Sequence, residues 1–421
     1  MDSLLSEKDR ATLHGEHGPA ARMAMTVLVR MLPVFGAERF LDITAAHIDS
    51  TLFQGDATLE YAERLASLGA RVVVPATLNV SGVDEHGWGA WHVPAEWAEK
   101  ARRQMVAYQS MGCTPTWTCA PYQQSERPLL GQQIAWGESS AVIFANSVLG
   151  ARTERYPDLL DICAAITGRA PAAGLHLEEN RAGQVLFQLR RVPQYVQEDD
   201  GFYGVLGHLV GKEAGEAIPV IEGIEAAPTE DQLKALGAAM ASSGVVALFH
   251  LVGVTPEAPT REAAFQGRSP DRSMDVTMDM LRAARRDLTT AQVESLDLVA
   301  LGSPHFSLDE FRKLAPLVAG LRRHEDVRFV VTASRAIKAL AARMGYMEAI
   351  ESFGGTVTVD TCILTTPMLS PDVRTVMTNS PKYAYYAPGL LGTQVVFGAL
   401  EDCVLSAVEG RVIQREGVWC A

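Results

Sequence analysis

Residues 296–333, LDLVALGSPHFSLDEFRKLAPLVAGLRRHEDVRFVVTA, decide the fold class of this chain. The run Leu296–Leu301 is short and apolar, as buried strands are, and Val327–Thr332 repeats that pattern. Between them, residues 308–321 place apolar side chains at helical spacing. A strand, a helix and a second strand within so short a stretch predict one unit of a parallel α/β sheet.

The same alternation extends outward from this stretch. Apolar residues at helical spacing predict helices over residues 20–32, 58–68, 232–243, 274–288 and 335–353. Short apolar runs predict strands over residues 40–43, 71–74 and 245–252. We therefore expect an α/β protein with largely parallel sheets, divided into an N-terminal part over residues 1–195 and a second part over residues 196–421.

Length and composition narrow the class of protein. The 421 residues suggest two or three domains, and the formal net charge of −13 makes binding to nucleic acid improbable. The N-terminal sequence lacks the layout of a signal peptide, and no run is long and apolar enough to span a membrane. Six cysteines are too few for a disulfide scaffold and fit a reducing compartment. We expect a soluble, cytoplasmic enzyme that binds neither nucleic acid nor membrane.

Three cysteines stand where a functional thiol is expected. Cys119 lies in the long polar stretch 113–131, Cys362 follows a β-rich run, and Cys403 opens a predicted helix. A loop of that length inside a compact domain is usually functional. The spacing of the three matches neither a zinc ribbon nor a ferredoxin, so the alternative that each is a small buried apolar residue stays open. That alternative is our expectation for Cys113, Cys163 and Cys420.

A second candidate group surrounds one predicted helix. Glu138, Ser139 and Ser140 stand just before an apolar helical run, where serine caps and acidic residues are ordinary. Asn146 falls inside the apolar part, and a buried amide needs hydrogen-bond partners. Polar groups at both ends of one helix indicate either a site or a plain helix cap.

Polar residues also follow several predicted strands. His47 and Asp49 follow one strand, Asn79 follows the next, and His305 follows the strand quoted above. Ligands of α/β proteins gather beyond the carboxyl ends of strands, although each of these residues also suits an ordinary turn. Lys382 is either a carboxylate-binding residue or a plain loop lysine.

Taken together, these segments resemble the large subunit of the aconitase X family, within the aconitase superfamily of dehydratases. The most specific stretches are Thr118–Tyr122, residues 134–153, Val359–Cys362 and residues 378–383. The resemblance runs from about residue 7 to residue 410. It implies aconitase-like α/β/α layers around a cleft that contains an iron–sulfur cluster.

The resemblance also implies roles for individual residues. It implies an iron–sulfur cluster held by three cysteines, here Cys119, Cys362 and, on a shorter motif, Cys403. Many relatives carry a cysteine where this chain has Ser303, which leaves the third ligand open. For the substrate pocket we expect catalytic roles for Glu138, Ser139 and His47 and substrate contacts from Asn79, Ser140, Asn146, His305 and Lys382.

Two activities are known in this family, dehydration of cis-3-hydroxy-L-proline and of mevalonate 5-phosphate. We see no clear phosphate-binding cradle in the sequence, although Arg152 or a partner subunit could contribute to one. We therefore expect removal of water from cis-3-hydroxy-L-proline to give 1-pyrroline-2-carboxylate. The alternatives are mevalonate 5-phosphate dehydration and a cluster-bearing regulatory protein without turnover.

The resemblance further implies a partner. Enzymes of this superfamily close their site with a small swivelling domain that supplies a serine thought to act as the base. The large-subunit resemblance leaves about ten residues after Gly410, so we expect the swivel domain to be a separate small subunit that forms a heterodimer with this chain. The alternative is a homo-oligomer whose neighbouring copies close the site.

Overall fold

The stretch that decides the fold forms the expected parallel unit. In the computed structural model, which describes residues 5–292, 294–415 and 417–419, it contains β10 (Leu298–Phe306), α12 (Leu308–Val318) and β11 (Arg328–Ala333). β10 and β11 pair in parallel, with Leu298 opposite Arg328. Ser307 begins α12 with a capping box, because its hydroxyl accepts from the Glu310 amide while the Glu310 carboxylate accepts from the Ser307 amide.

The chain has three consecutive parts, each built around a parallel sheet, and we call each of these sheets together with its helices a layer. The unit above belongs to the third layer. The five strands of the third layer are all parallel, in the order β12-β11-β10-β13-β14. The remaining strands are β12 (Thr356–Val359), β13 (Thr375–Thr378) and β14 (Gln394–Phe397). The remaining helices are α13 (Arg335–Arg343), α14 (Tyr346–Phe353), α15 (Pro381–Leu391) and α16 (Leu400–Glu409).

The first layer is built on three short parallel strands in the order β3-β2-β4. They are β2 (Ala46–Ile48), β3 (Ala76–Leu78) and β4 (Ala135–Trp136), beside an antiparallel pair of β1 (Phe40–Asp42) and β5 (Arg169–Pro171). The helices are α1 (Glu7–His14), α2 (Pro19–Met31), α3 (Asp56–Ser67), α4 (Ala95–Ser110), α5 (Ser139–Phe144) and α6 (Leu160–Thr167).

The second layer is a parallel sheet in the order β8-β7-β6-β9. Its strands are β6 (Val185–Gln188), β7 (Pro219–Glu222), β8 (His250–Leu251) and β9 (Arg272–Asp275). Its helices are α7 (Gln194–Gln197), α8 (Phe202–Ala214), α9 (Glu230–Ser243), α10 (Arg261–Ala264) and α11 (Met278–Asp287). The boundary expected at residue 195 falls inside this layer, after β6.

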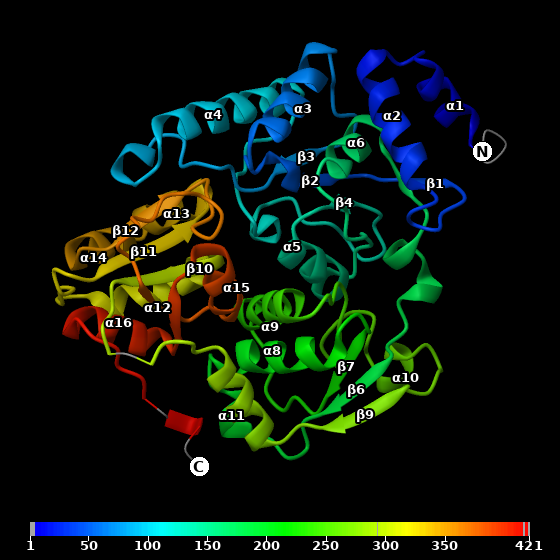
Figure 1. Ribbon diagram of the computed structural model, residues 1–421. Coiled ribbons are helices and arrows are strands. Elements are labelled where there is room, and N and C mark those ends of the chain that lie inside the picture. Colours follow the sequence, from blue (N-terminus) through cyan, green and yellow to red (C-terminus); the bar gives the residue numbers. More distant parts are fainter. Residues whose placement is uncertain (1–4, 293, 416, 420–421) are drawn as a thin grey trace.

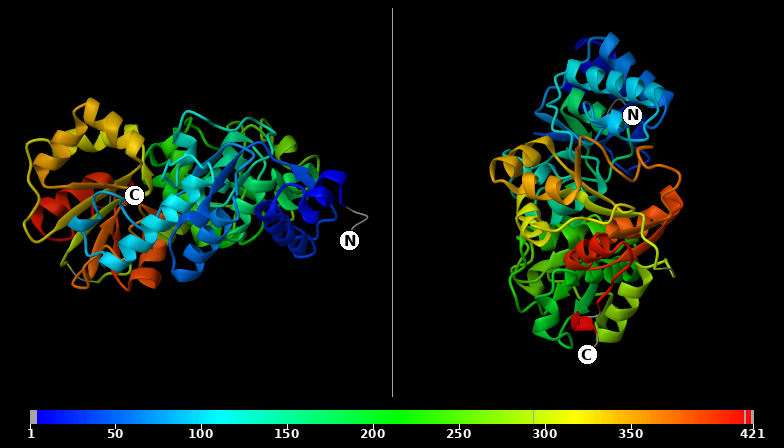
Figure 2. Two further views of the ribbon diagram at one scale, coloured as in Figure 1. Left: turned by 90° about the horizontal axis from the view of Figure 1, so that it is seen from above. Right: turned by 90° about the vertical axis from the view of Figure 1, so that its left-hand side faces the viewer.

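Helix α9 lies where the three layers meet. It packs against α8 of its own layer, α5 of the first layer and α15 of the third (Figure 1). Seen from above, the third layer lies at the end of the molecule opposite the N-terminus (Figure 2). The mixed α/β class with largely parallel sheets is the one that the sequence predicts.

Glycines bring α8 and α9 close together. A Cβ on Gly207 would lie 2.4 Å from the Leu236 carbonyl oxygen, and one on Gly211 would lie 2.4 Å from the Ser243 hydroxyl. Any larger residue at these two positions would force the helices apart. In the part of the chain that the structure describes, no helix combines the length and the apolar character needed to cross a bilayer.

Three predicted elements differ from the structure. The expected strand 71–74 is irregular, and the strand begins after Pro75 instead. Only His250–Leu251 of the expected strand 245–252 pairs with a neighbour. The expected helix 335–353 is two helices, because Gly345 takes a left-handed conformation between α13 and α14.

Candidate active site

Three neighbouring parallel strands of the first layer end in polar residues. Asp49 follows β2, Asn79 follows β3, and Glu138 follows β4 after Gly137. Because the carboxyl ends of parallel strands meet at one edge of a sheet, these side chains gather there. Asn79 Nδ2 donates a hydrogen bond to Asp49 Oδ1. Lys382, Cys119 and Cys362, described below, join this group. We call the six residues together the strand-end site: Asp49, Asn79, Glu138, Lys382, Cys119 and Cys362.

Lys382 brings a cation from the third layer to this edge. It lies in the first turn of α15, and its Nζ is 2.5 Å from Glu138 Oε1, with only 12% and 9% of the two side chains exposed. Burial acts to raise the pKa of Glu138, but the Lys382 ammonium outweighs it and holds that pKa below its ordinary value. Burial acts to lower the pKa of Lys382, but Glu138 raises it above its ordinary value. Both groups are therefore charged at neutral pH.

Glu138 is held by the helix that it begins. Its carboxylate accepts hydrogen bonds from the Ala141 amide at 2.7 Å and the Ser140 hydroxyl at 2.6 Å. Ser140 is buried and its hydroxyl donates to Glu138, so it positions this carboxylate and is not free for the substrate contact that the sequence predicts. Ser139 is partly exposed, and its hydroxyl lies 3.4 Å from Glu138 Oε1, farther than the Ser140 hydroxyl lies from the same carboxylate. The Ser139 hydroxyl is therefore more available.

His47 lies in the middle of β2 and is fully buried. Its Nδ1 is 2.8 Å from the Thr77 hydroxyl, and its ring leans on Trp136. Burial lowers the pKa of His47 to about 4, so the ring is neutral at pH 7. Its Nε2 and the Asn79 Oδ1 are buried without a partner in hydrogen-bond geometry among the described residues. The Asn79 side chain and the Thr118 backbone still act on the His47 ring, so His47 and Asn79 lie close together at this edge.

Cys119 and Cys362 complete the strand-end site. The charges of both cysteines contribute to the raised pKa of Lys382, and the charge of Cys362 also contributes to the raised pKa of Cys119. Burial is the main cause that raises the pKa of Cys119 to about 12. Both residues remain partly exposed, and both are free thiols. The structure therefore brings together two of the three expected cysteine ligands, beside a lysine.

His305 joins the two cysteine-bearing segments. Its Nε2 lies 3.0 Å from the Thr361 carbonyl oxygen, which only accepts, so Nε2 carries the hydrogen and Nδ1 accepts from the Thr118 hydroxyl at 3.1 Å. Its backbone amide donates to Cys119 Sγ at 3.3 Å. Both ring nitrogens are therefore occupied, which places His305 to hold these two segments together and leaves neither nitrogen free for the substrate contact that the sequence predicts.

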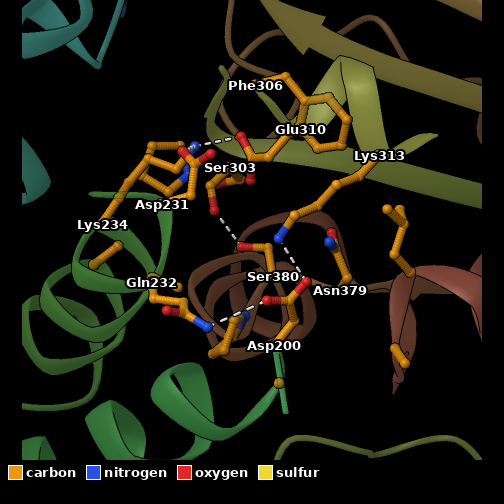
Figure 3. A pocket seen from close by; sticks show the side chains of 18 of the residues that line it. Asp200, Asp231, Gln232, Lys234, Ser303, Phe306, Glu310, Lys313, Asn379 and Ser380 are labelled. Atoms are coloured by element: carbon orange, nitrogen blue, oxygen red, sulfur yellow. Dashed lines mark hydrogen bonds and ion pairs between the residues drawn. The ribbon is translucent and has the colours of Figure 1, made fainter. Parts of the chain in front are cut away.

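A cavity of about 550 Å³ adjoins this group between α9, α12 and α15 (Figure 3). Its wall contains the buried Lys234, which pairs with Asp231 and Glu310 and lies 3.4 Å from the His305 carbonyl oxygen. Lys382 also lines it, so the cavity and the strand-end site meet at that residue. A volume of this size suits a small molecule.

Three family models match consecutive parts of the chain. The aconitase X first domain matches residues 3–179, the second domain residues 183–286 and the third domain residues 296–409. These ranges correspond to the three sheet layers. The chain belongs to the aconitase X family.

Relatives with known names divide into two groups. The chain is 49% identical to the cis-3-hydroxy-L-proline dehydratase of Pseudomonas aeruginosa over 96% of its own length and 70% of that protein. It is 40% identical to the phosphomevalonate dehydratase large subunit of Methanothermobacter thermautotrophicus over 93% of its own length and 96% of that protein. The crystal structure of aconitase X from Thermococcus kodakaraensis, in its holo-form, superposes with a TM-score of 0.86 at 34% identity and covers 96% of this chain and 99% of that one. The expected family and enzyme class, a dehydratase, are confirmed.

The cysteines of this aconitase X chain fit the expected cluster in part. Cys119 and Cys362 are partly exposed thiols at one edge, beside an ammonium that offsets the charge of thiolates. Among the residues that the structure describes, no three or more His, Cys, Asp or Glu side chains are grouped to hold a metal ion. The described residues therefore offer two free thiols at this edge, and no third cysteine is grouped with them.

Cys403, the third expected ligand, lies elsewhere in the chain. It is fully buried on α16, in the apolar core between that helix and the third sheet. Burial raises its pKa well above the ordinary value, as it also raises the pKa of Cys119. What distinguishes Cys403 is its position, which is that of a small apolar core residue, like the positions of Cys113 and Cys163. Cys420 lies outside the described residues.

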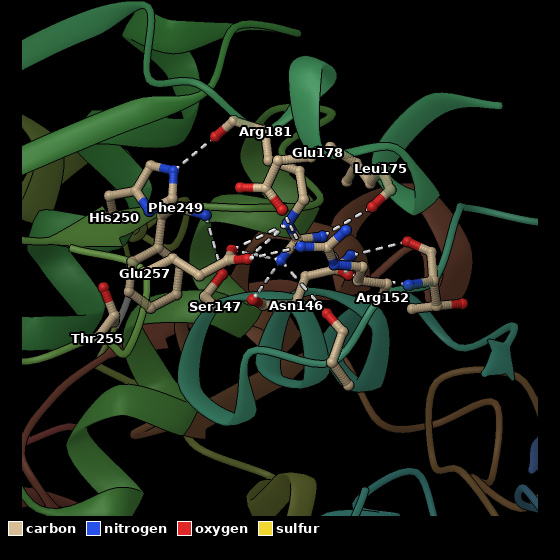
Figure 4. Close-up of polar contacts among 12 residues, drawn as sticks. Asn146, Ser147, Arg152, Leu175, Glu178, Arg181, Phe249, His250, Thr255 and Glu257 are labelled. Atoms are coloured by element: carbon tan, nitrogen blue, oxygen red, sulfur yellow. Dashed lines mark hydrogen bonds and ion pairs between the residues drawn. The ribbon is translucent and has the colours of Figure 1, made fainter. Parts of the chain in front are cut away.

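Asn146 is also not in the strand-end site. Its Nδ2 donates to the carbonyl oxygens of Thr153 and Ala247 at 3.0 and 2.9 Å. Its Oδ1 accepts from the Thr153 amide at 3.0 Å and from Arg181 at 3.2 Å (Figure 4). These four bonds use the whole amide and join the first two layers, so they leave no free polar atom of Asn146 for the substrate contact that the sequence predicts.

The sequence analysis gave no role to two residues of the site region. Asp49 was noted as a polar residue after a strand, with nothing to separate it from a turn residue. Lys234 lies in an ordinary amphipathic helix, and its partner Glu310 is 76 residues away in the sequence. A single lysine in such a helix gives no signal that it is buried.

Proposed function

We propose that this chain removes water from cis-3-hydroxy-L-proline to give 1-pyrroline-2-carboxylate. The 49% identity to a dehydratase named for that substrate supports the choice. The observation that carries it is the 2.5 Å pair between Glu138 and Lys382. A cyclic amino acid is a zwitterion, and an ion pair offers one charge to each of its ends: Lys382 to the carboxylate and Glu138 to the ring ammonium.

The main alternative is mevalonate 5-phosphate. A phosphate dianion calls for several unpaired cations or a cradle of backbone amides. Of the six residues of the strand-end site, Lys382 alone carries a positive charge, and the Glu138 carboxylate already neutralises that charge. Arg152, which the sequence left open as a phosphate ligand, pairs with Glu178 and lies 3.9 Å from Glu257. These pairings favour the zwitterion.

We propose that Cys119 and Cys362 hold an iron–sulfur cluster, with a third ligand that the structure does not assign. Such a cluster would supply a Lewis acid for the hydroxyl and carboxylate oxygens of the substrate. His305 would fix the two thiolates, because it is bonded to Thr118 and Thr361, the residues that directly precede them. Its amide would stabilise the Cys119 thiolate through the existing hydrogen bond to Sγ.

The residues of the strand-end site would orient the substrate. Lys382 and Glu138 would fix its two charged ends, and the Ser139 hydroxyl would hydrogen-bond to it. His47 Nε2 and Asn79 Oδ1, which make no hydrogen bond of good geometry among the described residues, would be available to the substrate. Fixing the ring in this way would hold the acidic α-hydrogen and the hydroxyl in one orientation, ready for elimination.

We further propose a small-subunit partner that supplies the base for the α-proton, and a heterodimer as the working enzyme. The archaeal relatives matched along almost their whole length carry the words "large subunit" in their names, which supports this partner. The free thiols of the described cysteines support a cytoplasmic location.

The test is a substrate comparison with the anaerobically reconstituted chain, alone and with the co-expressed small subunit. Nuclear magnetic resonance should detect 1-pyrroline-2-carboxylate from cis-3-hydroxy-L-proline and no product from mevalonate 5-phosphate. Turnover of the phosphate alone would favour the second dehydratase. A full iron complement with turnover of neither would favour a regulatory protein. Full activity of the chain without the small subunit would contradict the proposed partner.

A further inference from the structure

Asp49 occupies a position that the roles above leave unused. It is the first residue after the central strand β2, between the ends of β3 and β4. Its Oδ1 accepts from Asn79, whose own Oδ1 has no partner among the described residues, and the Asp49 residue is itself partly exposed. A Cβ on Gly137 would lie 2.8 Å from the Asp49 Cβ, so the glycine allows the end of β4 to approach this close.

The groups that face Asp49 disfavour a negative charge on it. Its backbone amide donates to Asp161 Oδ2 at 2.5 Å, and the carboxylates of Glu138 and Asp158 lie near enough to repel it. Asn79 is the group that acts in the opposite direction. Burial, followed by the charge of Glu138, raises the pKa of Asp49 to about 8.

Asp49 and Glu138 are therefore two neighbouring carboxyl groups in opposite states. Glu138 is ionised because Lys382 is beside it, whereas Asp49 has carboxylates around it and keeps its proton at neutral pH. In many enzymes the pKa values of two neighbouring carboxyl groups differ in this way, and the protonated group then acts as the acid while the ionised group forms an ion pair. A group that gives up a proton near the working pH is also the most effective general acid.

We propose that Asp49 is the general acid of the dehydration, the residue that protonates the departing hydroxyl group. This inference rests on the proposed function and adds a catalytic residue to it. The serine base of the small subunit takes the α-proton, and the electron pair of that C–H bond forms the C2=C3 double bond. The C3–O bond breaks with its electron pair on oxygen. The Asp49 proton then completes a water molecule. The enamine that remains gains a proton at C3 and loses one from nitrogen, which gives 1-pyrroline-2-carboxylate, and Asp49 regains a proton from solvent before the next cycle.

The experiment compares leaving groups in the reconstituted two-subunit enzyme. Its substrates are cis-3-hydroxy-L-proline and the analogue with fluorine in place of the hydroxyl, and its variants are Asp49→Asn and Asp49→Ser. Fluoride departs with less help from an acid than hydroxide does. Either variant should lower kcat for the hydroxy substrate by about 100- to 1000-fold, but for the fluoro analogue by less than about tenfold.

A matched control removes a neighbouring charge and keeps the acid. Asp158 is exposed, and its carboxylate contributes to the raised pKa of Asp49. Asp158→Asn should keep kcat within about twofold and move the alkaline limb of the pH profile to lower pH, because Asp49 then ionises more readily.

The outcomes separate this inference from the proposed function. Equal losses on the two substrates, or an unimpaired Asp49→Asn enzyme, would overturn the acid role while wild-type turnover leaves the proposed function in place. An iron-loaded wild-type enzyme that turns over neither compound would overturn both.

Discussion

Lys382 and Glu138, 244 residues apart in the sequence, form a 2.5 Å ion pair that joins the third layer to the first. The charge of Glu138 acts on Asp49, at the end of β2, and on Cys119, while Lys382 interacts with both Cys119 and Cys362. The pair therefore links the organisation of the layers to the chemistry of the strand-end site.

The first prediction concerns this pair. Lys382→Met leaves the Glu138 carboxylate buried and unpaired, so the free energy of unfolding should fall by roughly 3–5 kcal/mol. The double variant with Glu138→Gln should recover most of this loss in urea titrations, because it removes the unpaired charge. Both variants should lose at least about 100-fold in kcat/KM.

Lys313→Met is the control, since its partner Asp200 is 63% exposed, and should change stability by about 0.5 kcal/mol or less. Wild-type kinetic constants for Lys382→Met would place this lysine outside the substrate site.

The second prediction separates the cysteines. Cys119→Ala and Cys362→Ala should each abolish the visible absorbance and iron content of the reconstituted protein. Cys163→Ala and Cys403→Ala should keep both, because these thiols are buried away from the strand-end site. Cys403→Ala should instead lower the free energy of unfolding by about 1 kcal/mol through the small cavity it leaves. Loss of iron from the Cys403 variant would restore it as the third ligand.

The third prediction distinguishes a structural amide from a substrate contact. Asn146→Ala removes an acceptor of the buried Arg181 and both partners of the Thr153 backbone, so stability should fall by roughly 2–3 kcal/mol. Arg181 keeps its ion pair with Glu257, so the chain should still fold. The kcat/KM of the folded fraction should stay within about twofold of wild type. A raised KM with unchanged stability would return Asn146 to the substrate pocket.

The sequence predicts this fold where the pattern is local and fails where it is not. The unit at residues 296–333 is predictable, because its apolar spacing reflects pairing within the unit itself. Val72–Val74 reads as a strand, but Val73 is 63% exposed and its amide donates to the Ala165 carbonyl oxygen. That partner belongs to a helix almost a hundred residues away, and no local pattern announces it.

The site shows the same division between local and distant information. Position after a strand correctly brought Asn79 to this edge, since that rule depends on parallel strands alone. It was wrong for His47, which lies inside the short strand β2 and not after a strand. Composition could not tell whether the polar groups of Asn146 and His305 bind a substrate or other parts of the chain. Their partners Arg181 and Thr361 lie 35 and 56 residues away and only meet them in the folded structure.

The last prediction concerns stability and pH. Asp49 has a pKa of about 8 in the folded chain, against about 3.9 in an unfolded one. Between these values the folded state binds a proton that the unfolded state does not, so stability must fall as the pH rises towards 8. The slope from this group is about 1.4 kcal/mol per pH unit.

Neutral buried histidines such as His47 act in the opposite direction, but only below about pH 6.5, where unfolded histidine binds protons. Urea titrations between about pH 6.5 and 8 should therefore show a smaller decline for Asp49→Asn than for wild type, and Asp161 and Glu310 contribute equally to both proteins. Parallel slopes would mean that Asp49 is already ionised in the folded chain and cannot act as the acid.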